Sequence, residues 1–296
     1  MKYLHYFETE SEYNQARDNN YEEPWVSYTE GEGLDYNKPY DPYIHMPFTI
    51  EALSSGNITW SLQNKTVQYS KNGGTWETMN SSTTISVTDG DEIQFKGTNK
   101  YYDYEDGGCS IASTASFNVK GNAMSLTDGD NFESVTNIES CALGYILYNC
   151  TNLISAENLR LPVTTLAESC YCYMFTGCRN LIHAPQLPAT TLATRCYSYM
   201  FNYCSSLTSA PELPATTLVN GCYSAMFREC TNVNYVKAMF TTDPNTDDDR
   251  GKALYTYCWL YHVSSTGTFV KNNSATWTLN NEDGIPSGWT VQTAVE

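Results

Sequence analysis

The residues of this sequence whose type and spacing best suit chemistry are its cysteines, ten of which fall between Cys141 and Cys258. Thiolates can ligate zinc, pair as disulfides or act as nucleophiles. Cys196 and Cys204, however, stand eight residues apart, without the Cys-x-x-Cys or His spacing of zinc sites. Small, weakly polar side chains at a fixed interval suit the tight interior of a stacked coil. The spacing therefore favours packing over disulfides or metal binding, and we expect no metal and no cofactor.

Other residue types suggest little catalytic potential. Two Thr-Asp-Gly-Asp segments, 88–91 and 127–130, and the acidic run 247–249 offer oxygen ligands for calcium, but none has a complete loop with a distal bidentate Glu. Ordinary Asp-Gly turns and a solvated loop are favoured. The four histidines occur in unrelated settings: His5, His45, His183 and His262. Because no hydrolase, phosphate-loop or zinc-protease motif is present, we expect a non-enzymatic protein. A glycan-processing enzyme stays an alternative, since glycosidase carboxylates leave no local motif.

A 26-residue repeat underlies the cysteine pattern. Its three clear copies begin at Leu161, Leu187 and Leu213. From Leu192 to Met200 the apolar residues recur at a spacing that predicts a helix, whereas Pro211 and Pro214 make the following stretch extended. Such a unit buries its apolar side chains only against its neighbours, so the pattern predicts a solenoid of about four coils, with parallel strands plus helices.

Tyrosines recur at the same interval and are the candidate ligand-facing residues of the repeat: Tyr171, Tyr197 and Tyr223. They lie on the flank of the predicted helix, where their rings could stack on sugars or on a protein partner. Packing between neighbouring repeats is an equally good interpretation of this spacing.

The chain divides into four parts and is expected to have a mixed α+β fold. Residues 1–44 form an extended N-terminal arm, and 45–130 have the short β-prone runs and Gly-containing turns of an antiparallel, immunoglobulin-like β-sandwich. Residues 131–241 form the solenoid, and 242–296 its C-terminal cap, with a helix at 253–262. The expected strands are 48–53, 66–70, 84–87, 92–95 and 116–119 in the sandwich, and 267–271 and 288–292 in the cap.

The N-terminal arm is the candidate docking segment. It holds eight Tyr and one Trp among ten acidic and three basic residues, a net charge of −7, which is a poor basis for a core of its own. Such a segment becomes ordered when its rings bury against another protein. Packing against the following domain is the alternative. The expected anchoring residues are Tyr6, Phe7, Tyr13, Trp25 and Tyr28.

The formal charge of −17 argues against nucleic acid and anionic lipid as partners, because both are held by basic residues. No apolar run approaches the roughly 20 residues of a membrane span, so no membrane insertion is expected. The residues after Met1 lack the apolar stretch of a secretory signal. We therefore expect the chain to stay where it is made, or to leave by lysis or within an assembly.

The pattern Met-Phe-x-x-Cys-x-x-Leu followed by a Leu-Pro turn resembles the BspA-like branch of the leucine-rich repeats, found on surface proteins of Bacteroidales. The matches are Phe175-Cys178-Leu181, Phe201-Cys204-Leu207 and, with Val233 replacing Leu, Phe227-Cys230. The layout is also similar to gene products of crAss-like gut phages. In those proteins a Tyr-Phe-Glu-Thr-Glu-Ser-Glu-Tyr opening and a Pro-Trp-Val-Ser-Tyr-Thr-Glu segment precede a β-domain of the Val-Gln-Tyr-Ser-Lys-Asn-Gly-Gly type and such repeats.

The phage resemblance implies a virion structural protein, made in the host bacterial cytoplasm and displayed on the virion surface as a head fibre or capsid decoration. Its arm would bind capsid or other virion proteins, and its repeats would face a host surface glycan or protein. A homo-oligomer, dimer or trimer, is expected. The alternatives are a tail fibre or receptor-binding protein, and a bacterial cell-surface adhesin with the same repeats.

Overall fold

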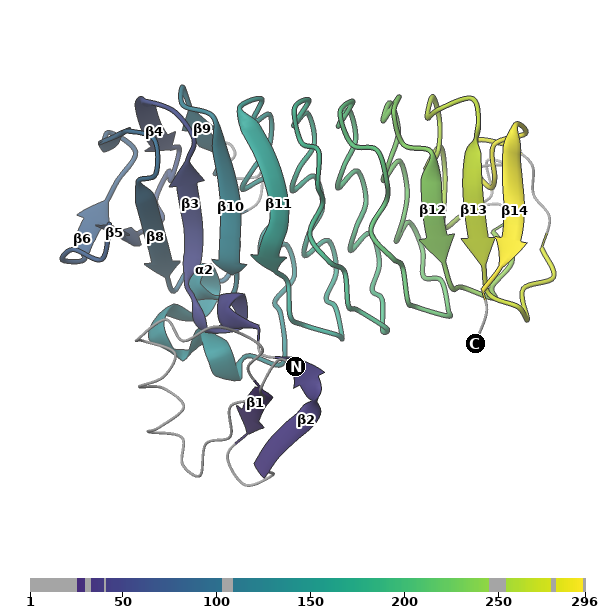
Figure 1. Cartoon of the computed structure of the whole chain (residues 1–296), viewed down its shortest axis with the longest axis horizontal. Coiled ribbons are helices and arrows are strands. Elements are labelled where there is room, and N and C mark those ends of the chain that lie inside the picture. The colour runs from purple at the N-terminus through teal and green to yellow at the C-terminus, as the bar shows by residue number, and fades with distance from the viewer. Residues whose placement is uncertain are drawn as a thin grey trace, which may run out of the picture.

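The computed structural model describes the backbone of residues 26–29, 33–39, 41–102, 109–244, 254–277 and 281–294. Within these residues the protein is mostly β, with antiparallel sheets first and a parallel three-stranded sheet at the C-terminal end (Figure 1). The one α-helix among them is α2 (Ser125–Asp128), and η1 (Pro42–His45) and η2 (Gly129–Ser134) are short 3₁₀ turns. The expected mixed α+β class is therefore corrected to a mostly β one.

Two sheets pack face to face in the first half of the chain. The first contains, side by side, β10 (Phe117–Asn122), β3 (Phe48–Ala52), β8 (Glu92–Gly97), β5 (Val67–Lys71) and β6 (Glu77–Met79), all antiparallel. The second contains β7 (Thr84–Val87), β4 (Gly56–Trp60) and β9 (Ile111–Ser113). Trp60 of the second sheet meets Phe95 of the first edge-on, with ring centroids 5.5 Å apart. All five strands expected here are confirmed; β4, β6 and β9 were not predicted.

A separate antiparallel hairpin precedes them, formed by β1 (Val26–Thr29) and β2 (Gly33–Pro39). The segment that follows it belongs to the body. Asp41 forms an ion pair with Arg160 of β11 (Leu153–Arg160), and the Asn122 amide donates a hydrogen bond to the Ile44 carbonyl at 3.1 Å. Residues 41–45 thus contact β10 and β11, near the middle of the molecule.

The first sheet continues without interruption into the repeats. β11 pairs with β10 in parallel, which gives the strand order β11-β10-β3-β8-β5-β6. Beside this junction lies Gly121, whose φ of +85° and whose distance to Pro47 leave no space for a side chain: a Cβ would sit 2.1 Å from the Pro47 carbonyl oxygen. The two halves of the chain therefore share a hydrogen-bonded sheet instead of being joined by a linker.

Beyond the junction the chain winds into stacked coils, each with a turn segment and an extended segment (Figure 1). We call them coils A to F: 141–163, 166–189, 192–215, 218–241, 254–277 and 281–294. β12 (Tyr235–Ala238), β13 (Gly267–Lys271) and β14 (Trp289–Thr293) are the parallel strands of coils D to F. Isolated bridges align the extended segments of coils B and C with their outer neighbours. The two strands expected in the C-terminal cap are confirmed, and the segment continues the stack.

The helix expected in each repeat is wrong, because a series of turns takes its place. In coil B every fourth residue has a positive φ: Ser169 at 54°, Tyr173 at 59° and Gly177 at 78°. A left-handed residue interrupts an α-helix. Tyr173 donates its backbone N–H to Ser198 of coil C at 3.0 Å, whereas Met174 donates to Tyr171 within its own coil at 3.3 Å. Alternate amides thus join neighbouring coils instead of closing helical turns.

The helix expected at 253–262 is wrong for the same reason. Cys258 and His262 have φ values of 52° and 57°, and the Ala225 amide donates to the Tyr257 carbonyl at 2.8 Å. The described part of this segment, from Leu254, is therefore the turn segment of coil E. Its Trp259 ring stacks on Tyr223 of coil D with centroids 6.1 Å apart, which extends the interior of the stack.

Candidate functional site

Seven of the cysteines line the interior of the coils, as expected, and four of these form a ladder of hydrogen bonds. All eleven lie among the described residues and carry no disulfide. In each of coils A to D one buried thiol donates to a backbone carbonyl of the preceding layer. The pairs are Cys150 to Ile111 at 2.9 Å, Cys178 to Leu147 at 3.0 Å, Cys204 to Phe175 at 3.1 Å and Cys230 to Phe201 at 2.9 Å. The first of these bonds ties coil A to strand β9 of the second sheet.

Burial also makes these thiols poor nucleophiles. Desolvation raises the pKa of Cys150, Cys196 and Cys222 to about 12, and that of Cys178 and Cys204 well above the usual range. The thiolate is the form that attacks electrophiles and binds metals. No group of three His, Cys, Asp or Glu side chains among the described residues is arranged to hold a metal ion. The ladder is therefore structural.

We predict that iodoacetamide at pH 8 modifies the native protein slowly and only at the half-buried positions Cys141, Cys172 and Cys258. The other thiols are buried and protonated, whereas all eleven should react after denaturation. Mass spectrometry of peptides from native and denatured samples measures this. Rapid labelling of Cys178 or Cys204 in the native protein would contradict the ladder.

The three tyrosines expected to face a ligand lie inside the stack, so that expectation is corrected. Tyr171, Tyr197 and Tyr223 are at most 1% exposed, and their rings stack with centroids 5.7 Å and 6.1 Å apart. A second interior column runs beside them through Phe175, Phe201 and Phe227, with spacings of 5.3 Å and 5.6 Å. The alternative, packing between repeats, is what the structure shows, because stacking buries each large ring on both faces.

A third aromatic column, again of tyrosines, lies on the outer side of the turns. Tyr145, Tyr173 and Tyr199 are half-buried and stack with centroids 4.8 Å and 4.6 Å apart. Two of them stand two residues after the predicted tyrosines, so the repeat interval alone could have indicated them. Because each ring covers the face of the next, this column offers mainly ring edges to a partner. Tyr203, 43% exposed, belongs to the turn segment of coil C.

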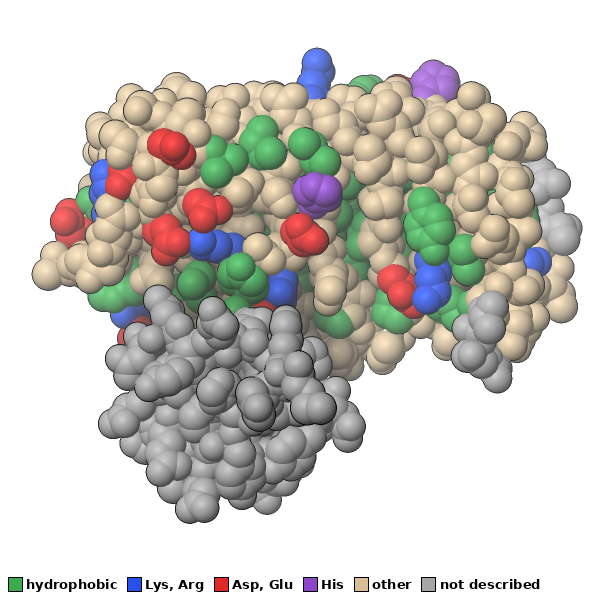
Figure 2. All heavy atoms as spheres, in the orientation of Figure 1, with side chains coloured by type: hydrophobic (Ala, Val, Ile, Leu, Met, Phe, Trp, Pro, Cys, Tyr) green, Lys and Arg blue, Asp and Glu red, His purple; other side chains and the backbone are tan. Residues whose placement is uncertain are grey.

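The opposite face is formed by the strands and carries the best candidate site. On this face charged side chains occur in small clusters of both signs, separated by uncharged and hydrophobic surface (Figure 2). The bridges align Ser155 with His183, and Ser209 with Tyr235, whose side chain is 39% exposed. Between coils B and C the face has a groove of about 500 Å³. Its lining includes Pro185, Pro188, Pro211, Pro214, Glu157 and Glu212.

Glu212 at this groove is held by a lysine of the next coil. Its carboxylate lies 2.9 Å from Lys237 Nζ, and this contact raises the pKa of Lys237. Glu157 has an exposed side chain. The groove thus combines proline rings with carboxylate acceptors, an arrangement suited to binding a ligand and lacking any activated nucleophile.

Comparisons of this chain with models of protein families, with curated proteins and with solved structures find no match. Its function must be argued from its own residues.

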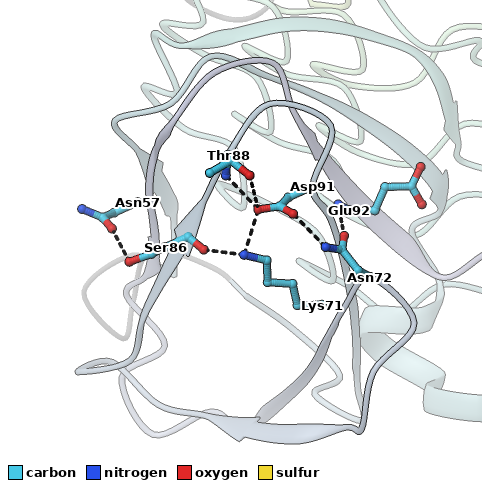
Figure 3. A network of polar contacts seen from close by, with 7 residues as sticks. All are labelled: Asn57, Lys71, Asn72, Ser86, Thr88, Asp91 and Glu92. Atoms are coloured by element: carbon cyan, nitrogen blue, oxygen red, sulfur yellow. Dashed lines mark hydrogen bonds and ion pairs between the residues drawn. The ribbon is translucent and has the colours of Figure 1, made fainter.

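The first Thr-Asp-Gly-Asp segment is a structural clip (Figure 3). The Asp91 carboxylate accepts hydrogen bonds from Asn72 and from the Thr88 backbone N–H, both at 2.7 Å, and lies 2.8 Å from Lys71 Nζ. Lys71 also donates to the Ser86 carbonyl of β7 at 2.8 Å, so the lysine joins the two sheets. The hydrogen bond from Lys71 and those from Asn72 and Thr88 hold the pKa of Asp91 well below its usual range.

The second copy engages lysines in the same way. Asp128 lies 3.1 Å from Lys100 Nζ, and Asp130 lies 2.7 Å from Lys96 Nζ. Ion pairs with lysines thus occupy Asp91, Asp128 and Asp130, which disfavours calcium binding at both segments. The expected Asp-Gly turn is wrong for the second segment, which is the junction of α2 and η2. The acidic run 247–249 lies outside the described residues.

The remaining candidates are dispersed. His45 pairs with Glu133 at 2.6 Å, His262 pairs with Glu229 at 3.1 Å, and His183 is exposed on the strand face. Of the expected anchoring residues, Tyr28 lies in β1, whose backbone alone is described; the other four, Tyr6, Phe7, Tyr13 and Trp25, lie outside the described residues. None of the described helices is both long enough and apolar enough to cross a membrane.

Proposed function

We propose that this chain is a structural protein of a bacteriophage virion, displayed on the capsid as a head fibre or decoration protein. In this proposal the N-terminal arm binds capsid or other virion proteins. The body presents its coils to a host surface glycan or protein, and the chain assembles as a dimer or trimer. We assign the two packed sheets to the immunoglobulin-like sandwiches and the coils to the BspA-like leucine-rich repeats.

The repeat assignment is supported by what the motif residues do. The aromatic-x-x-Cys core supplies the Phe175, Phe201 and Phe227 column and, three positions further along each turn series, the thiol donors. Each coil gains these contacts only from its neighbours, which is how repeat proteins are stabilised. Because the motif residues stack and form hydrogen bonds between neighbouring coils, the motif supports a scaffold role more than a catalytic one.

The display function is supported chiefly by the contrast between the N-terminal arm and the body that follows it. The arm is acidic and rich in tyrosine, as expected of a segment that orders on a partner. The body that follows is a stiff unit, because β10 and β11 join the sandwich and the coils through backbone hydrogen bonds. A binding segment followed by a rigid rod suits attachment at one end and presentation at the other.

We predict that deleting residues 1–40 abolishes incorporation into virions and leaves a folded body. The junction lies before Asp41, because Asp41 and Ile44 make contacts with Arg160 and Asn122 that a longer deletion would remove. Phages produced with the wild-type or truncated gene are purified, and the protein is quantified in the particles. The circular dichroism spectrum and the melting of the isolated body check that it folds.

A matched full-length variant with Trp25→Ala and Tyr13→Ala keeps the chain length and tests the aromatic anchors themselves. Normal incorporation of the truncated protein would overturn the arm as anchor. Electron microscopy with antibodies against the coils separates the alternatives: label on the tail indicates a tail fibre, and label on uninfected bacterial cells indicates an adhesin.

A further inference from the structure

The strand face is split between coils B and C. On one side of that boundary two backbone hydrogen bonds join coil A to coil B, and on the other side an equivalent pair joins coil C to coil D. In coils A and B, Ile182 donates to Ile154 and Ala156 to His183; in coils C and D, Asn234 donates to Thr208 and Ala210 to Tyr235, all at 2.9–3.0 Å. Between 181–189 of coil B and 207–215 of coil C, both fully described, the structure has no backbone hydrogen bond.

Prolines explain why the split occurs at this boundary. Coil B has Pro185 and Pro188 in its extended segment, and coil C has Pro211 and Pro214. Proline has no N–H to donate and restricts the residue before it. The facing stretches of coils A and D, 153–161 and 233–241, contain no proline, so each can pair with a proline-rich neighbour. Where two proline-rich segments meet, the four prolines interrupt the row of N–H donors on both sides, and the groove lies at this place.

The split leaves backbone donors and acceptors available along both rims. The Ala184 N–H and the Ser209 carbonyl occupy the positions that Ala210 and Tyr235 use for their hydrogen bond at the next boundary. Neither has a partner among the described residues. Proline rings between the rims supply apolar contact surface, and Glu157 adds a carboxylate acceptor. A ligand that fits must offer hydroxyl groups, which both donate and accept, together with apolar faces.

We propose that this groove binds a neutral oligosaccharide. Sugar hydroxyls match the Ala184 N–H, the Ser209 carbonyl and the Glu157 carboxylate, and the C–H faces of the rings can lie on the prolines of the groove. Beyond the groove, on the far side of the coil C strand, exposed Tyr235 pairs with Ser209 and offers a further ring to a longer oligosaccharide. In a chain of charge −17, the Glu157 carboxylate, which is unpaired among the described residues, disfavours acidic sugars. An extended peptide added as a strand needs a continuous row of partners, which the prolines remove. The inference rests on the proposed display function and names the ligand class that the coils meet.

The test uses the full chain on an array of neutral hexose and N-acetylhexosamine oligosaccharides beside oligosaccharides containing uronic or sialic acid. The best neutral binder is then titrated by calorimetry against the wild type, Tyr235→Ala and Glu157→Gln. We expect binding of a neutral oligosaccharide, weakened about tenfold by each variant, as expected when one contact of the bound ligand is lost. Tyr203→Ala, which removes an equally exposed ring from the turn side, is the matched control and should bind like the wild type.

Absence of any neutral binder, stronger binding of acidic sugars, or equal binding by wild type and both groove variants would each overturn the proposal. A loss in Tyr203→Ala alone would place the site on the turn side and overturn it as well. Particle incorporation is measured separately. Virions that incorporate the protein normally while it binds no sugar contradict only this inference, and sugar binding by a protein absent from virions contradicts only the display function.

Discussion

Replacing Phe201 with alanine should lower the free energy of unfolding by about 3–5 kcal/mol, as is typical when a buried aromatic side chain is truncated. Phe201 is fully buried in the middle coil, stacked between Phe175 at 5.3 Å and Phe227 at 5.6 Å, and its carbonyl accepts the Cys230 thiol hydrogen bond. Alanine would leave a cavity that touches three coils at once. Urea unfolding followed by circular dichroism measures the loss.

The control for this variant is Tyr203→Ala in the same turn series. Tyr203 shares the positive φ of the series, at 62°, but its side chain is 43% exposed. Its truncation should change the unfolding free energy by no more than about 0.5 kcal/mol. Equal losses in the two variants would show that the phenylalanine column contributes no more than a surface ring does.

The interior of the coils was predictable because a repeat interval identifies equivalent positions. A cysteine that recurs at one position of the repeat must have the same environment in each coil. Because that position is buried, a small side chain is needed there. The strands of the sandwich were predictable where apolar and polar residues alternate between Gly-containing turns, as in Thr84–Val87. β4 was missed because its Gly56 and Asn57 resemble a turn.

The helix was predicted wrongly for a reason that the sequence contains. Leu192, Cys196, Met200 and Cys204 recur at a strict interval of four. An α-helix advances by 100° per residue, so a period of four drifts by about 40° at each step, whereas a series of four-residue turns keeps these residues on one side. The difference between a helix and a series of four-residue turns also explains why Tyr171 is buried. In the turn series two adjacent residues of each turn, such as Cys170 and Tyr171, face inward.

The shared sheet and the groove depend on segments meeting in space, which local patterns do not encode. More than thirty residues separate the starts of β10 and β11, and nothing near either strand marks them as partners. The groove requires two proline-rich segments to be neighbours. The prolines alone predicted extended chain correctly, but the loss of pairing follows only from the order of coils A to D.

Replacing Gly121 with alanine should destabilise the protein by about 2–5 kcal/mol, because it combines left-handed strain with overpacking. The new Cβ would lie 2.1 Å from the Pro47 carbonyl oxygen and 2.9 Å from that of Met46, at a φ of +85°. Those carbonyls cannot move away freely, since the Met46 carbonyl accepts the Asn122 N–H at 2.7 Å.

Gly73→Ala is the matched control: its φ is +69°, but no atom lies within 4 Å of the new Cβ, so only about 1–2 kcal/mol should be lost. Denaturant unfolding of both variants separates the cost of left-handed strain, which both share, from the cost of overpacking, which only Gly121→Ala has. If both lose the same amount, the segment at Pro47 is not held tightly against β10. A larger loss for Gly121→Ala supports a rigid junction between the packed sheets and the coils.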